Sequence, residues 1–178
     1  ICDSKKEYPV TVLVDEALSG NISGRNAICE NESTTLNATA YDASTYTWKE
    51  GATVLAQSGV VTVKPLVTTT YEVEMTRGKC SATDNYMVEV TTNPVIVSVD
   101  SVGVRDRQVI TEAGKGTAPF EFWYDENTAN ASVDDIFYGL TFTTHVAHVK
   151  DINGCQASYK FILDPPAINV PEFFTPNG

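Results

Sequence analysis

The sequence has few of the residues on which catalytic and metal sites are usually built. Its only histidines are His145 and His148, and its four cysteines form neither a C-x-x-C pair nor a cysteine–histidine cluster at zinc spacing. It contains no Gly-x-Ser-x-Gly nucleophile motif and no glycine-rich loop with the Walker spacing. These absences favour a protein that is not an enzyme and that carries no cofactor.

Long apolar runs and positive charges are also scarce. No stretch of 18 apolar residues occurs, and no segment keeps a 3.6-residue apolar period long enough to predict a helix. The 12 Lys+Arg are outnumbered by 23 Asp+Glu, which gives a net charge of −11. Because such a chain repels phosphate backbones and anionic headgroups, we expect no nucleic-acid partner and no direct membrane insertion.

The residues that are abundant favour strands. Threonine and valine recur along the chain, together with 8 Tyr, 7 Phe and 2 Trp. Side chains of these types fit the pleated, half-buried surface of a sheet. The 178 residues leave room for two domains of about 80–100 residues each. We therefore predict an all-β fold.

An internal repeat divides the chain. The segment 2–12 aligns without a gap on 80–90, with Cys, Tyr, Val and Val at the same places, and a looser third copy begins at Cys155. Each copy reads as a turn, a cysteine and an alternating strand, so every second side chain faces one side. We interpret these copies as the last strands of three successive units.

The repeat predicts the domain organisation. We expect residues 1–15 to be the last strand of a preceding repeat, 16–93 and 94–166 to be two β-sandwiches, and 167–178 to begin as a linker. The alternating segments and turn signals predict strands at 27–30, 34–40, 45–49, 60–63, 70–75, 85–90, 95–100, 108–112, 120–124, 132–137, 143–150 and 156–163.

The spacing of the cysteines suggests disulfides and an oxidising compartment. Cys29 lies early in the first sandwich and Cys80 lies near its last strand, so a Cys29–Cys80 disulfide is expected to join the two sheets. The alternative is a pair of reduced, buried thiols. Cys2 and Cys155 stay unassigned: they are free, paired with each other, or linked to partners outside the chain.

Short motifs in the first sandwich resemble the immunoglobulin-like or PKD-like repeats of large Bacteroidetes surface proteins. They are Ile28-Cys29-Glu30, Thr35-Leu36-Asn37-Ala38, Tyr46-Thr47-Trp48, Val67-Thr68-Thr69-Thr70-Tyr71-Glu72-Val73 and Gly78-Lys79-Cys80. This resemblance covers nearly the whole of 16–93 and implies an immunoglobulin-like β-sandwich. We also expect Trp48 to lie in its core.

The second sandwich is similar to the SprB-type repeat of gliding-motility adhesins. The motifs that carry this resemblance are Gly116-Thr117-Ala118-Pro119-Phe120-Glu121-Phe122, Leu140 and Val149-Lys150-Asp151-Ile152-Asn153-Gly154-Cys155. The final nine residues, 170–178, resemble the opening of the type B sorting domain of the type IX secretion system, which implies that 167–178 are a linker and the truncated start of such a domain. That resemblance implies a parent protein that is carried to the cell surface or released from it.

Some polar clusters are better explained by structure than by chemistry. His145 and His148 lie in an alternating strand, where an odd offset places them on opposite faces, so no shared metal site is expected. The pairs Asp125-Glu126 and Asp134-Asp135 lie near predicted turns, and sequence neighbours on a strand point apart, whereas glycoside hydrolysis needs two carboxyl groups held across a cleft. A solvated turn explains each pair better than a hydrolytic centre, and no calcium-loop motif is present.

Two residues are candidate functional sites. Phe120, Phe122 and Tyr124 are expected to share the core, which leaves Trp123 outward as a candidate ligand-binding platform for sugar rings. The alternative is burial of Trp123 against a loop or a neighbouring unit. Ser101, within Asp100-Ser101-Val102, resembles the Bacteroidetes O-glycosylation motif and is a candidate O-glycosylation site.

The function that the sequence favours is a non-catalytic repeat region of a cell-surface or secreted adhesin, acting as a stalk and in cell adhesion. Its expected partners are glycans or extracellular proteins and the neighbouring repeats of the parent protein. One alternative is a dedicated carbohydrate- or protein-binding module. Another is a set of accessory domains of an enzyme exported by type IX secretion.

Overall fold

The computed structural model describes residues 9, 17–103 and 107–166. The predicted strand of 1–15, apart from Pro9, and the motif of 170–178 lie outside the described residues. Regular structure in the described part consists of strands and one short 3-10 helix, η1 (Thr128–Asn130), which confirms the all-β prediction. No helix among these residues is long and apolar enough to cross a membrane.

The strands follow one another along the chain with short connections. They are β1 (Gly20–Ser23), β2 (Ala27–Cys29), β3 (Thr34–Ala40), β4 (Thr45–Glu50), β5 (Thr53–Ala56), β6 (Val60–Val63), β7 (Thr69–Arg77), β8 (Cys80–Thr91), β9 (Pro94–Gly103), β10 (Gln108–Lys115), β11 (Glu121–Tyr124), β12 (Ile136–Phe137), β13 (Thr144–Lys150) and β14 (Gln156–Ile162). Every strand predicted within the described residues overlaps one of these, whereas β1 and β5 were not predicted.

The chain forms two compact units whose segments alternate along the sequence. Among the described residues, unit 1 consists of 17–26, 34–63 and 69–88, and unit 2 consists of 27–33, 64–68, 89–103 and 107–166. The predicted division into 16–93 and 94–166 assumed two continuous stretches, and it stays a prediction.

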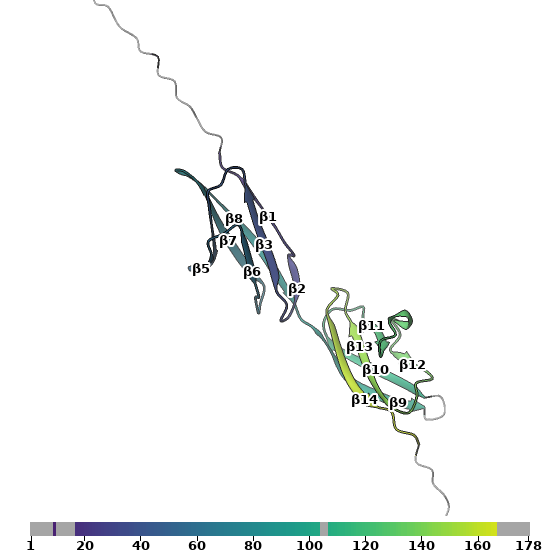
Figure 1. Cartoon of the computed structure of the whole chain (residues 1–178). Coiled ribbons are helices and arrows are strands. Elements are labelled where there is room, and N and C mark those ends of the chain that lie inside the picture. The colour runs from purple at the N-terminus through teal and green to yellow at the C-terminus, as the bar shows by residue number, and fades with distance from the viewer. Residues whose placement is uncertain (1–8, 10–16, 104–106, 167–178) are drawn as a thin grey trace, which may run out of the picture. The chain divides into compact units, whose positions relative to one another are not determined.

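Strands β1 to β8 form two sheets (Figure 1). One is the antiparallel sheet β1-β3-β6, and the other has the order β2-β8-β7-β4-β5, with β2 parallel to the end of β8. In β3, Thr34, Leu36 and Ala38 are buried while the residues between them are exposed, as a half-buried strand requires. Trp48 of β4 is fully buried, which confirms its predicted place in the core.

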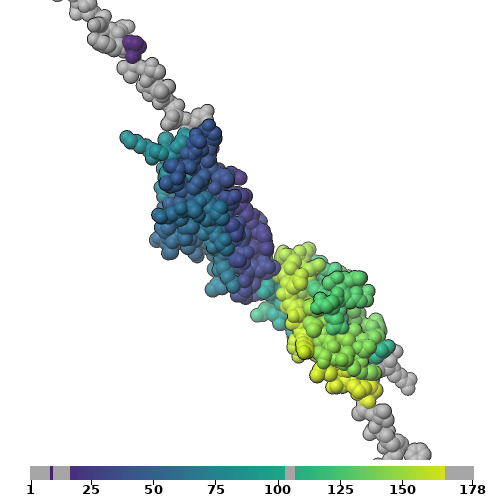
Figure 2. Space-filling model, viewed as in Figure 1, coloured from purple at the N-terminus to yellow at the C-terminus, as the bar shows by residue number. Residues whose placement is uncertain are grey.

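Unit 2 also contains two sheets, β12-β10-β9 and β11-β13-β14. They pack through buried side chains from both layers, and alternation brings these to the inner faces. The buried core consists of Ile96, Val109, Phe122, Tyr124, Ala147, Val149 and Leu163. The segment between β11 and β12, green in Figure 2, lies on the outside of this unit.

The disulfide differs from the prediction, because Cys29 is bonded to Cys155 and Cys80 is free. The predicted Cys29–Cys80 pair is wrong because β2 and β8 are neighbours in one sheet. Cys29 lies opposite Thr91 at the end of β8, whereas Cys80 begins that strand. At about 3.3 Å per residue, the length of β8 separates them by more than 30 Å, far beyond the span of a disulfide.

Candidate functional site

Trp123 is buried, with 8% of its surface exposed. It faces away from Phe122 and Tyr124, as alternation along β11 predicts, but its ring stacks on that of His148 at a centroid distance of 5.0 Å and an interplanar angle of 2°. The two residues lie opposite each other in the β11–β13 register. The expectation that Trp123 forms an exposed aromatic platform is therefore corrected: its ring surface is already covered.

The other sequence candidates lie apart from one another. Ser101 is exposed on β9, so its hydroxyl is accessible, and its O-glycosylation stays a prediction. His145 is buried on the core side of β13 and His148 lies on its other face, as the odd offset predicted. Among the described residues, no three His, Cys, Asp or Glu side chains gather closely enough to hold a metal ion.

His145 holds two loops against β13. Its Nδ1 lies 2.7 Å from Asp125 Oδ2 and its Nε2 lies 2.8 Å from the Thr141 carbonyl oxygen. Because both ring nitrogens face acceptors, the charged imidazolium with two N–H donors fits this place. The Val146 N–H donates to Asp125 Oδ1 at 3.0 Å, which fixes the carboxylate.

These contacts shift both pKa values. Burial acts to lower the pKa of the His145 imidazole, but the hydrogen bonds to Asp125 and Thr141 outweigh burial and raise that pKa above its ordinary value. For Asp125, burial acts to raise the pKa, and the bonds from His145 and Val146 lower it below its ordinary value. Each charged form therefore stabilises the other.

The pair makes the free energy of unfolding depend on pH. The His145 contribution is fully present below its unfolded pKa of about 6.5 and is lost as pH rises through the raised folded pKa. The Asp125 contribution is present above its unfolded pKa of about 3.9 and is lost as pH falls through the lowered folded pKa. In urea unfolding, we expect the stability lost in His145→Phe to be largest between about pH 4 and pH 6.5.

The control for this experiment is His148→Phe, on the same strand, because the His148 ring stacks on Trp123 and forms no ion pair among those of the described residues, and its charge is the smallest of the influences on the pKa of Asp125. A loss in His145→Phe that is constant across the whole pH range would contradict the imidazolium assignment.

Asp151 is a buried residue whose carboxylate accepts several backbone hydrogen bonds, whereas the sequence analysis assigned it only to a turn. Its side chain is almost completely buried, and Oδ1 accepts from the backbone N–H groups of Asn153 at 3.0 Å and Cys155 at 2.9 Å. Oδ2 accepts from the Thr117 N–H at 3.1 Å. The expected Asn153-Gly154 turn is present, with Gly154 at φ 86°, but the carboxylate of Asp151 is what holds Cys155 in place.

A cavity of about 490 Å³ opens between the two sheets of unit 2 and is the strongest candidate for a binding site. We call it the edge groove, because it lies between the edge strand β11 and the part of β10 beyond its short pairing with β12. It is lined by 111–113 of β10, by Pro119, Phe120 and Phe122, and by 133–135, which precede β12. Sequence analysis singled out Asp134-Asp135 but did not bring them together with the two phenylalanines.

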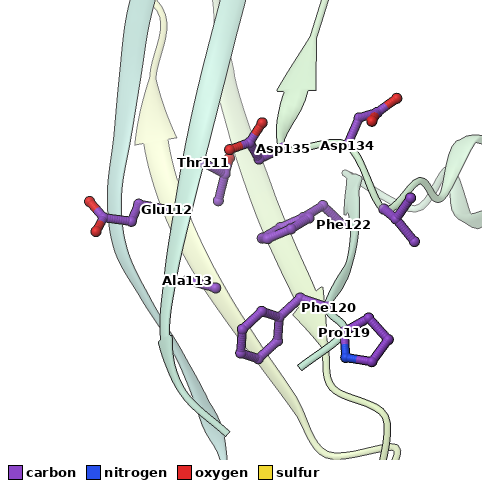
Figure 3. A pocket seen from close by; sticks show the side chains of 9 residues that line it. Thr111, Glu112, Ala113, Pro119, Phe120, Phe122, Asp134 and Asp135 are labelled. Carbon is purple, nitrogen blue, oxygen red and sulfur yellow. The ribbon is translucent and has the colours of Figure 1, made fainter. Parts of the chain in front are cut away.

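Aromatic side chains form one wall of the edge groove. Figure 3 shows Phe120 and Phe122 reaching toward β10, with Thr111 and Ala113 pointing back at them and Glu112 pointing away. The Thr111 hydroxyl is hydrogen-bonded to the Tyr124 hydroxyl in the buried interior. The groove therefore has an apolar interior that is closed at depth by one satisfied polar pair.

Carboxylates border this apolar interior. Asp134 and Asp135 lie at one end of the groove, and Glu112 lies on the outer face of β10 (Figure 3). All three residues are exposed, and no lysine or arginine is among the described residues that line the groove. An aromatic wall with an acidic border suits a ligand that combines apolar and positively charged groups.

No protein-family profile matches the sequence, and no curated protein matches it. Among solved structures, it is similar to a C-terminal 282-residue fragment of intimin in complex with the intimin-binding domain of the translocated intimin receptor. The TM-score is 0.55, with 15% identity, over 83% of this chain and 64% of that fragment. It is also similar to the N-terminal eight Ig domains of Down syndrome cell adhesion molecule, with a TM-score of 0.51 and 11% identity over 79% and 23% of the two chains.

At these identities the likeness establishes the fold alone. The chain has the immunoglobulin-like β-sandwich fold, which confirms the predicted fold class. It spans less than two thirds of the length of either neighbour. What those neighbours bind therefore has no direct bearing on the edge groove, whose chemistry comes from the residues of this chain.

Proposed function

We propose that this chain is a non-catalytic, extracellular repeat region of a cell-surface or secreted protein, where it acts as a stalk and in adhesion. The observation that carries the proposal is the Cys29–Cys155 disulfide within an immunoglobulin-like β-sandwich fold. Disulfides persist in oxidising compartments outside the cytosol, and this one closes a loop of 126 residues. A covalent closure of that length suits a region that must stay folded outside the cell.

The sequence motifs supply the finer part of the proposal. The SprB-type and PKD-like motifs, together with the sorting motif of 170–178, favour a Bacteroidetes parent protein exported by type IX secretion to the outer face of the outer membrane. Ser101 is exposed within its O-glycosylation motif, in keeping with that route. The division of this region into repeats at 16–93 and 94–166 belongs to the same proposal.

A second candidate function, a dedicated protein- or glycan-binding module, is favoured by the edge groove. The groove combines Phe120 and Phe122 with exposed carboxylates, and such a mixture is common in recognition sites. A β-sandwich that serves only as a spacer needs no groove of this kind, because side chains normally fill the space between its two sheets. The two functions are compatible in one adhesive stalk.

Adhesion is tested with beads coated with this chain and exposed to immobilised extracellular-matrix proteins and to a glycan array. We expect retention on at least one surface, with a dissociation constant in the micromolar range that is typical of weak, transient contacts. Soluble chain added as a competitor should release the beads. If coated beads are retained no better than uncoated beads on every surface, the adhesive function is wrong.

A further inference from the structure

The β10 strand has an open edge beside the edge groove. On this side β10 is paired with β12 only at Val109 and Ile110, after which the Thr111 N–H donates to the Asp135 carbonyl at 2.9 Å. The other side of β10 is paired with β9 from Gln108 to Lys115, with register shifts between Gln108 and Val109 and between Glu112 and Ala113. Beyond Thr111, therefore, no described strand pairs with the groove side of β10.

The alternating direction of the backbone N–H and C=O groups determines which of them on β10 have no strand partner. In an antiparallel ladder, the N–H and C=O of every second residue point to the same neighbour. The ladder with β9 has a register shift between Glu112 and Ala113, where Val97 of β9 is the extra residue, so β10 itself keeps its alternation and the side chains of Thr111 and Ala113 both face the groove (Figure 3). Because the Thr111 N–H points away from β9, we infer that the N–H and C=O of Ala113 point to the groove side as well. Unpaired backbone groups on a strand edge are a template for one more strand.

The same alternation gives the side-chain preferences of an added strand. Thr111 and Ala113 point toward Phe120 and Phe122, so inward side chains of an added strand would contact the aromatic wall (Figure 3). Outward side chains would lie beside Glu112 on the opposite face of the ladder. Asp134 and Asp135 add negative charge at the end where the groove is closed.

From this geometry we propose that the edge groove takes an extended segment of a partner protein, with alternating apolar and basic side chains, which pairs with β10 at Ala113. The apolar side chains fill the space in front of Phe120 and Phe122, and the basic ones face Glu112, Asp134 and Asp135. This inference deepens the proposed adhesion, since it names the chemistry of the partner segment.

Charge argues for a foreign partner segment over a second copy of this chain. Each copy carries a net charge of −11, so two copies brought edge to edge at Glu112 would repel each other. Exposed Val133, with 73% of its surface accessible, extends the apolar lining of the groove outward. A peptide with apolar side chains on one face covers this surface, and its basic side chains neutralise the acidic border.

The test uses a fluorescent eight-residue peptide of alternating lysine and valine, and its alternating glutamate and valine counterpart. We expect the lysine peptide to bind with a micromolar dissociation constant and the glutamate peptide to bind at least about tenfold more weakly. Amide hydrogen exchange read by NMR should show new protection at Ala113, because an added strand takes up that N–H.

Two charge-reversal variants distinguish binding of the lysine peptide in the groove from its general attraction to an acidic protein. Asp134→Lys lies in the groove and Glu126→Lys lies outside it, and both positions are exposed, so the two variants change the net charge equally. We expect Asp134→Lys to weaken binding of the lysine peptide by about tenfold and Glu126→Lys by less than about twofold. Equal effects of the two reversals would overturn the proposal, as would binding without protection of Ala113.

Two further outcomes would assign the open edge or the groove to a different ligand. Dimers of the free chain whose formation protects Ala113 would assign the edge to a second copy, and perturbation of Phe120 and Phe122 by a glycan, with no peptide binding, would assign the groove to sugars. Either result overturns the proposal. If beads coated with the wild-type chain and with Asp134→Lys adhere equally, the groove assignment fails while the proposed adhesion stands. If the lysine peptide binds but no surface retains the beads, the groove assignment stands while the proposed adhesion fails.

Discussion

Replacing Cys29 or Cys155 by serine is expected to lower the free energy of unfolding by about 5 kcal/mol. The bond joins residues separated by 126 positions, and in the chain-entropy description a loop of this length restricts the unfolded chain by that amount. Urea unfolding under non-reducing conditions measures the loss. Thermal unfolding should shift down by roughly 10–20 °C for a chain of this size.

Cys80→Ser is the matched control for the disulfide. Cys80 carries no bond and is only partly buried, so we expect its replacement to change the unfolding free energy by less than about 1 kcal/mol. The Cys29→Ser/Cys155→Ser double variant should be no less stable than either single variant, because both remove the same bond. A non-reduced peptide map that joins Cys29 to Cys80 would overturn the pairing.

Asp151→Ala is expected to destabilise the protein by about 3 kcal/mol. The substitution removes the acceptor of three backbone N–H groups, those of Thr117, Asn153 and Cys155, and a buried donor without a partner costs about 1–3 kcal/mol. The loss appears in urea unfolding. Because Asp151 also positions Cys155, we further expect the disulfide of this variant to be reduced faster by dithiothreitol.

The matched series distinguishes lost hydrogen bonds from lost volume or charge. Asp151→Asn keeps one carbonyl oxygen, which can still accept from Asn153 and Cys155, so it should lose roughly half as much stability as Asp151→Ala. Asp164→Ala removes an exposed carboxylate after β14 and should change stability by less than about 0.5 kcal/mol. Equal losses in Asp151→Ala and Asp164→Ala would contradict the role assigned to Asp151.

The sequence was informative wherever a strand buries one face. Thr34–Ala40 and Val60–Val63 were placed to the residue, and Trp48 was assigned to the core, because alternating burial leaves a period of two in the sequence. The strands that were missed bury almost nothing: Gly20–Ser23 contributes one buried residue and Thr53–Ala56 contributes none. An edge strand of that kind has no periodic pattern to recognise.

Contacts set by strand register could not be predicted in the same way. The partner of Cys29 depends on β2 lying in parallel beside the end of β8, and no local pattern encodes that pairing. Trp123 faces outward from its sheet as predicted, yet the cross-strand position of His148 covers its ring. The edge groove likewise depends on where β12 stops pairing with β10, which is a matter of three-dimensional geometry.

The disulfide also determines how the protein extends under tension. A pulling force applied to the two ends of the chain runs through the sulfur–sulfur bond and leaves the loop between Cys29 and Cys155 unloaded. Only the segments outside that loop, which include β1 and β14, can be drawn out while the bond is intact. At about 3.3–3.6 Å per residue, the 126-residue loop holds back roughly 420–450 Å of contour length, which becomes available only on reduction.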